Sequence, residues 1–280
     1  MAAEQLRCLF MEFLGNFDTL AGIKRWKEVG FRDVTPRPPG VTQEIVKFNT
    51  PAVALKWPQF QQAVANLPAK EEPDWCWISG HHGRQKSSDW DGNESSWPNH
   101  IATEKKVGFF NKAYHDFAWP NGNPLRPQQI FMTTTRQPTD PQALAPTDNP
   151  LFTKVRDQCK GVVLIGCYSL GVYNSERETY KTMFPNALLI GLSFRTDGLR
   201  NQVAPLLDNT KIFDQDFYRS PKTDLQSLAK YCYYLNLHLH TPATINLQYG
   251  DRTAGYDSSS HTATAADESG NTAVFPTKSK

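Results

Sequence analysis

Short apolar runs alternate with amphipathic segments along most of the chain, a pattern that is typical of strands alternating with helices. Apolar stretches of strand length occur at 6–14 (LRCLFMEFL), 42–50 (TQEIVKFNT), 75–79 (WCWIS), 161–165 (GVVLI) and 186–194 (NALLIGLSF). Alternating elements of this kind predict an α/β fold with a mostly parallel sheet that is covered by helices on both faces.

The segments between these runs carry helix signals. In PQFQQAVANL, Phe60, Ala63, Val64 and Leu67 recur at the spacing of one helix face. A helix that follows Asp18 is expected to end at Gly30. Further helices are predicted at 150–158, 195–207 and 224–237.

Two regions depart from this pattern. Residues from 84 to about 149 are rich in Ser, Asp, Asn, Pro and Thr, which predicts a long surface insertion with a few short elements. Residues 249–280 are rich in Ser, Thr and Ala, and this composition predicts a flexible tail. We therefore expect one domain over residues 1–248, followed by that tail.

Composition and charge exclude several classes of protein. A formal net charge of +2 and the lack of a basic run argue against direct nucleic-acid binding. No apolar run reaches the roughly 20 residues that span a bilayer, and Arg7 and Glu12 interrupt the N-terminal apolar stretch. Five irregularly spaced cysteines do not form a disulfide framework, which favours a reducing, cytoplasmic setting.

Two of the predicted strands end in residues that carry chemistry. The strand WCWIS runs into Gly80-His81-His82-Gly83, and the strand GVVLI runs into Gly166-Cys167-Tyr168-Ser169. Ligands of open α/β sheets bind outside the carboxyl ends of the strands, so neighbouring strands would bring His and Cys together. A cysteine attacks as its thiolate, and a histidine beside it supplies the activation that this requires at neutral pH.

This pair of strand ends resembles the caspase-like (clan CD) cysteine peptidases, and the element order is similar to that of bacterial CHAT domains. The resemblance rests on a strand ending in His-Gly and a later strand ending in a small residue followed by Cys, here Gly166-Cys167. It implies a three-layer caspase-like fold and a thiol protease that needs no metal or organic cofactor. The interval between the two motifs is long, so the 84–149 insertion must loop out, and it is a candidate regulatory loop or autoprocessing site.

By that resemblance, Cys167 is the nucleophile and His82 is the general acid/base, with His81 as the other candidate for the base. The backbone N–H groups of Gly83 and Cys167 would form the oxyanion hole. The substrate would be an extended peptide, in most cases part of another protein, and many relatives need an activating protein partner. Asp197 and Arg195 are candidate substrate-pocket residues, and they would favour basic and acidic substrate side chains respectively.

Other interpretations remain open. Cys167-Tyr168-Ser169-Leu170-Gly171 also resembles the nucleophile elbow of an α/β-hydrolase, which would make the protein a serine esterase that uses Ser169. If Cys167 is the nucleophile instead, Ser169 is expected to cap the helix that follows. A caspase-like interaction module without activity is a third hypothesis.

The remaining cysteines and a metal site complete the alternatives. Cys76, His81 and His82 form a weak zinc candidate because a paired C-x-x-C is missing. Cys8, Cys76, Cys159 and Cys232 lie in strand or helix patterns and are expected to be packing residues.

Overall fold

The computed structural model describes parts of the chain, and these are most continuous from residue 155 onward. The described residues are 5–12, 26, 28–36, 62–79, 81–85, 106–110, 131–132, 143–144, 155–166, 169–171, 174–193, 209–237, 239 and 244–276. Within them the chain is a mixed α/β protein with a nine-stranded sheet and few helices.

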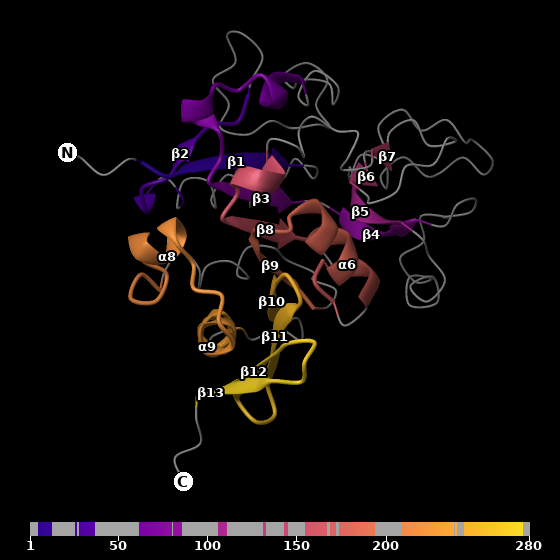
Figure 1. Cartoon of the computed structure of the whole chain (residues 1–280), viewed down its shortest axis with the longest axis vertical. Coiled ribbons are helices and arrows are strands. Elements are labelled where there is room, and N and C mark those ends of the chain that lie inside the picture. Colours follow the sequence, from indigo (N-terminus) through magenta and orange to yellow (C-terminus); the bar gives the residue numbers. More distant parts are fainter. Residues whose placement is uncertain are drawn as a thin grey trace.

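The sheet has a parallel half and an antiparallel half, in the order β13-β12-β11-β10-β9-β8-β3-β1-β2 (Figure 1). The parallel strands are β1 (Arg7–Glu12), β2 (Arg32–Asp33), β3 (Trp75–Ser79), β8 (Gly161–Ile165) and β9 (Leu188–Leu192). Four of the apolar runs are therefore confirmed as strands, whereas the strand predicted at 42–50 lies outside the described residues. The expectation of a mostly parallel sheet holds only for this half.

Most of the other half is formed by residues that were expected to be a flexible tail. β10 (Ile245–Tyr249), β11 (Arg252–Asp257), β12 (Thr262–Ala266) and β13 (Thr272–Phe275) form an antiparallel meander that continues the sheet from β9. The prediction for 249–280 was wrong over this range because small alanines alternate with threonines. Ala263 and Ala265 are fully buried, whereas Thr264 between them is exposed.

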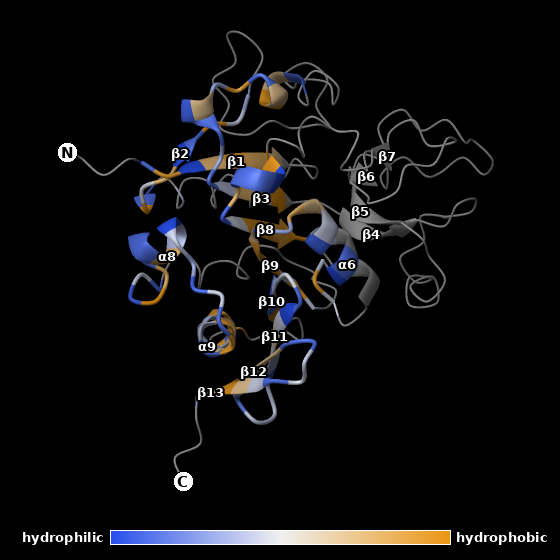
Figure 2. Cartoon of the chain, viewed as in Figure 1, coloured by the Kyte–Doolittle hydropathy of each residue, from blue (hydrophilic) through white to orange (hydrophobic). Residues whose placement is uncertain are grey.

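Both faces of the central strands are buried, because successive side chains alternate between two apolar clusters. In β3, Trp75 and Trp77 belong to one cluster, and Cys76 and Ile78 belong to the other. α8 (Gln215–Arg219) and α9 (Leu225–Asn236) contribute to the first cluster, and α6 (Asn174–Met183) contributes to the second. Figure 1 shows α8 and α9 on one side of the sheet and α6 on the other. Figure 2 shows the central strands β1, β3 and β8 in the orange of hydrophobic residues, whereas β11 and β12 are paler.

Several helix signals are confirmed. α9 begins after Asp224, whose carboxylate accepts a hydrogen bond of 2.9 Å from the Ser227 amide. Gly30 ends the first helix with φ of 103°, and the Phe31 amide donates to the Trp26 carbonyl at 3.0 Å. Residues 62–65 and 155–158 are helical, a short 3₁₀ turn follows at Ala69–Glu71, and the helix predicted at 195–207 lies outside the described part.

The insertion between β3 and β8 begins with strands. β4 (His81–Gln85) pairs antiparallel with β5 (Lys106–Phe110), and β6 (Phe131–Met132) pairs with β7 (Ala143–Leu144). The short elements expected within 84–149 are thus present, and β4 starts earlier than the expected boundary of the insertion.

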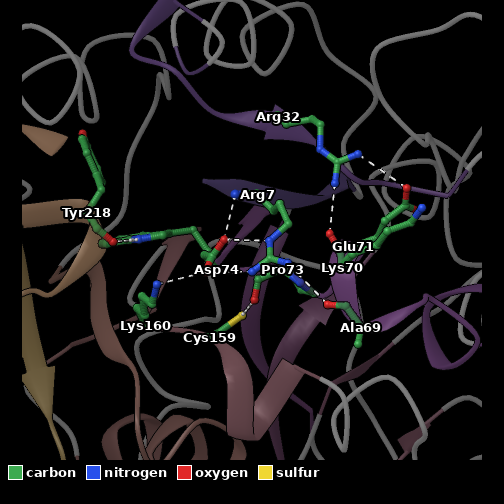
Figure 3. Close-up of polar contacts among 11 residues, drawn as sticks. Arg7, Arg32, Ala69, Lys70, Glu71, Pro73, Asp74, Cys159, Lys160 and Tyr218 are labelled. Carbon is green, nitrogen blue, oxygen red and sulfur yellow. Dashed lines mark hydrogen bonds and ion pairs between the residues drawn. The ribbon is translucent and has the colours of Figure 1, made fainter. Parts of the chain in front are cut away.

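A buried carboxylate joins the starts of three neighbouring strands (Figure 3). Asp74 precedes β3 and accepts from the amide of Arg7 at 3.0 Å and from its Nε at 2.9 Å, at the start of β1. Its other oxygen accepts from Lys160 Nζ at 3.0 Å, directly before β8. Burial alone would raise the pKa of Asp74, but the hydrogen bonds from Arg7 and Lys160 outweigh that effect and hold the pKa below its usual value. This network fixes the register of the strands that lead to the candidate site.

Candidate active site

The strands that precede the His and Cys motifs are direct neighbours in the sheet. β3 and β8 run parallel and in register, from Trp75 opposite Gly161 to Ser79 opposite Ile165. Because the strands are parallel, the chain leaves both of them at the same edge of the sheet. His81 and Cys167 each stand two positions beyond the last paired residue of their strand, and His82 stands three beyond. The two motifs therefore follow neighbouring strands at the same edge of the sheet, which is the arrangement that a His–Cys pair requires.

The histidine motif lies in a second strand, β4, which follows β3 directly. His81, His82 and Gly83 are the first three residues of β4, where His82 pairs with Phe109 and Gly83 with Gly108 of β5. Only the backbone of these residues is described. β5 in turn contacts α6, the helix that follows the cysteine motif, so the β4–β5 ribbon lies on the same side of the sheet as that helix (Figure 1).

The cysteine motif begins where β8 ends. The Ser169 amide donates a hydrogen bond of 3.2 Å to the Gly166 carbonyl, so residues 166 and 169 lie close together. Cys167 and Tyr168 are the two residues between them, and both lie outside the described part, as do Arg195 and Asp197. Residues 166 and 169–171 are described, and they show how the chain on either side of Cys167 is held.

The Ser169 hydroxyl is engaged in two hydrogen bonds inside the protein. Ser169 is fully buried, and its Oγ donates to the Leu164 carbonyl at 2.7 Å and accepts from the Leu192 amide at 3.0 Å. A serine nucleophile needs an accessible hydroxyl whose proton passes to a base. The Ser169 hydroxyl instead ties the ends of β8 and β9 together. It does not cap α6, which begins only at Asn174.

Two further residues, Gly191 of β9 and Asn246 of β10, contact Ser169 or Leu170. Gly191 of β9 has no room for a side chain, because an added Cβ would lie 2.8 Å from Leu170 Cγ and 2.9 Å from Ser169 Oγ. The amide of Leu170 donates to the Leu192 carbonyl at 3.0 Å, and its carbonyl accepts from Asn246 Nδ2 of β10 at 2.7 Å. Ser169 and Leu170 therefore rest directly on the backbone of β9, and Leu170 is also held from β10.

The other four cysteines are packing residues, as the sequence predicted. Cys8, Cys76, Cys159 and Cys232 are buried, and burial raises the pKa of each thiol. Cys76 lies inside an apolar cluster, which leaves the zinc candidate without an accessible cysteine ligand. Across the described ranges, no three or more His, Cys, Asp or Glu side chains are grouped so that they could hold a metal ion.

Sequence reasoning missed Gly191 and Asn246. Gly191 interrupts the apolar run LLIGL, and a glycine inside a strand is a known sign of close backbone approach. Asn246 breaks an otherwise apolar strand start, and a buried amide requires a partner. Neither signal shows, from the sequence alone, which residues Gly191 and Asn246 contact.

No helix in the described part of the chain is long and apolar enough to cross a membrane. Searches of protein-family models and of curated proteins give no match to this chain.

Proposed function

We propose that the protein is a cysteine endopeptidase with a caspase-like, three-layer α/β fold, in which Cys167 is the nucleophile and His82 is the general acid/base. The observation that carries this proposal is the parallel, in-register pairing of β3 with β8 up to Ser79 and Ile165. Adjacent strands lie ~5 Å apart, so residues that follow their ends can act on one substrate.

The surroundings of Cys167 support the choice of nucleophile. The hydroxyl of Ser169 is buried and acts both as a hydrogen-bond donor and as an acceptor within the protein, which removes the main support for a serine esterase. The four other thiols are buried in the core. Cys167, two residues after β8, is the remaining cysteine of the sequence.

The chemistry would proceed through an acyl-enzyme. The Cys167 thiolate attacks the scissile carbonyl carbon, and the resulting oxyanion accepts hydrogen bonds from the N–H groups of Gly83 and Cys167. His82 then donates a proton to the amine that leaves, and later takes one from the water that hydrolyses the thioester. Since Gly83 pairs with Gly108, its oxyanion role requires that its N–H points away from β5.

Limited alkylation tests the dyad directly. The wild type, His82→Ala and His81→Ala are treated briefly with limiting iodoacetamide near neutral pH, and peptide mass spectrometry gives the labelling rate of each cysteine. We expect selective labelling of Cys167 that slows in His82→Ala and not in His81→Ala. Slowing in His81→Ala alone would move the base to His81, and labelling of Cys167 no faster than that of a free thiol would contradict the proposal.

Substrate preference is tested with fluorogenic peptides that differ at the residue before the scissile bond. Arg195 would favour an acidic residue there, and Asp197 would favour a basic one. Arg195→Ala and Asp197→Ala serve as matched variants, because only the change at the residue that lines the pocket should weaken cleavage of the preferred peptide. Cleavage after Asp alone would rule out Asp197 as the specificity residue.

A further inference from the structure

Strand β10 reaches the segment that carries Cys167 through one polar side chain. Asn246 pairs with Gly191 of β9 and is buried, with 6% of its surface exposed. Its neighbours Ile245 and Leu247 belong to the cluster packed under α9, so Asn246 lies on the other face of the sheet. Its Nδ2 donates to the Leu170 carbonyl at 2.7 Å.

This contact completes a clamp, the set of contacts from β9 and β10 that holds Ser169 and Leu170. On the β9 side, Gly191 allows Ser169 and Leu170 to lie against its Cα, and Leu192 bonds to both of them. On the β10 side, Asn246 holds the carbonyl of Leu170, which is three residues after Cys167. The backbone is thus fixed on one side of the nucleophile position by β8 and on the other by β9 and β10.

We infer that Asn246 is a positioning residue for Cys167: by holding the Leu170 carbonyl it keeps the thiol in place against its histidine, so that β10 contributes to the reactivity of the site. The inference rests on the proposed function, because Asn246 acts only through Cys167. A displacement of a reacting group by about 1 Å can cost on the order of 100-fold in rate.

The chain offers a matched control on the opposite face. Asn236 of α9 is also a buried amide that holds β10, since its Nδ2 donates to the Ile245 carbonyl at 2.8 Å and its Oδ1 accepts from the Ile245 amide at 2.7 Å. In the described part of the chain its side chain hydrogen-bonds to Cys232 and Ile245, on the face covered by α9. Asn236→Asp therefore introduces the same chemical change near the same strand without touching the clamp.

The test compares wild type, Asn246→Asp and Asn236→Asp as full-length proteins. The alkylation rate of Cys167 is measured across about pH 5 to 9, and thermal unfolding gives the stability of each variant. At neutral pH we expect Asn246→Asp to lower the rate about 10- to 100-fold, because its carboxylate repels the Leu170 carbonyl. The rate relative to wild type should recover at acid pH, where the protonated carboxyl can donate to that carbonyl. Asn236→Asp should keep the wild-type rate whatever its loss of stability.

The outcomes separate the inference from the proposed function. An unchanged rate in Asn246→Asp, or an equal loss in both variants, would overturn the positioning role. If the wild-type thiol titrates at an ordinary pKa of ~8.5, the proposed function fails, and rates above that pH still report how the segment is held. In that case, equal alkylation rates of Cys167 in wild type and Asn246→Asp above that pH would also overturn the role of Asn246 in holding the chain beside Cys167. If Asn246→Asp does not fold, the smaller and neutral Asn246→Ser replaces it, with a loss of rate expected and no recovery at acid pH.

Discussion

Asp74 and Lys160 form an ion pair of 3.0 Å directly before the first residues of β3 and β8. The same carboxylate binds Arg7 at the start of β1. Because Asp74 and Lys160 stand opposite each other one step ahead of the pair Trp75–Gly161, they set the register that ends at Ser79 and Ile165. The network lies at the opposite end of these strands from the candidate site, and it determines which residues follow each strand there.

Replacing Asp74 should therefore weaken the fold and change its response to acid. We expect Asp74→Asn to lower the free energy of unfolding by about 2 kcal/mol, since hydrogen bonds to charged groups contribute about 1.5–3 kcal/mol. The folded-state pKa of Asp74 is below its usual value, so its contribution is present above the unfolded pKa of ~3.9 and is lost as pH falls through the folded pKa. Urea unfolding of wild type at decreasing pH should show this loss, and Asp74→Asn should show less of it.

Glu71→Gln is the matched control for that experiment. Arg32 and Glu71 form a longer pair of 3.5 Å, in which 43% and 36% of the side-chain surface is exposed. Exposed pairs contribute less than about 1 kcal/mol. If the two substitutions lowered the free energy of unfolding equally, the Asp74 network would not be what fixes the starts of these strands.

Ser169 should behave as a structural residue. Ser169→Ala removes the acceptor of the buried Leu192 amide, so we expect a loss of about 1–3 kcal/mol in the free energy of unfolding. Peptide hydrolysis should be reduced and not abolished, and a fluorophosphonate should not label wild-type Ser169. Thr35→Val is a suitable control, because the Thr35 hydroxyl accepts from the Phe10 amide in the same way at the far edge of the sheet. Labelled Ser169, with hydrolysis abolished at wild-type stability, would instead indicate a serine enzyme.

Thiol titration should distinguish one cysteine from the rest. Cys8, Cys76, Cys159 and Cys232 are buried and their raised pKa values leave almost no thiolate at neutral pH. In the native protein we expect an aromatic disulfide reagent to react rapidly with Cys167 alone, and with all five cysteines after denaturation. The native Cys167→Ser variant should show no fast reaction. A second fast thiol would contradict the packing role of the other four.

The main strands of the parallel half, and the points where β3 and β8 end, were predictable from the sequence, whereas the pairing of β3 with β8 was not. WCWIS and GVVLI are continuous apolar runs followed by a glycine, and this local signal fixes both the strand and its end. The contacts around Cys167 were not predictable in the same way. Asn246 and Leu170 are distant in the chain, and they meet only because β10 adds to the sheet beside β9.

The C-terminal meander was mispredicted because the prediction rested on the amino-acid composition of the segment and not on its two-residue hydrophobic period. A segment rich in Ser, Thr and Ala has little apolar surface, which is the usual sign of disorder. In this fold the rings of α9 supply that surface. The ring centroids of Tyr233 and Tyr234 lie 5.3 and 5.7 Å from that of Phe275, and Ala263 and Ala265 are buried in the same cluster. The two-residue period of TATAA was the informative signal.

The alternation in β12 gives a direct test of that packing. Ala265 is fully buried in the cluster under α9, whereas its neighbour Thr264 is exposed on the other face. Ala265→Leu should overpack this layer and lower the free energy of unfolding by about 1–3 kcal/mol. Thr264→Leu adds an apolar side chain at the adjacent position and should change stability by less than about 0.5 kcal/mol. Urea unfolding of both variants measures the difference, and a mobile tail would leave the two indistinguishable from wild type.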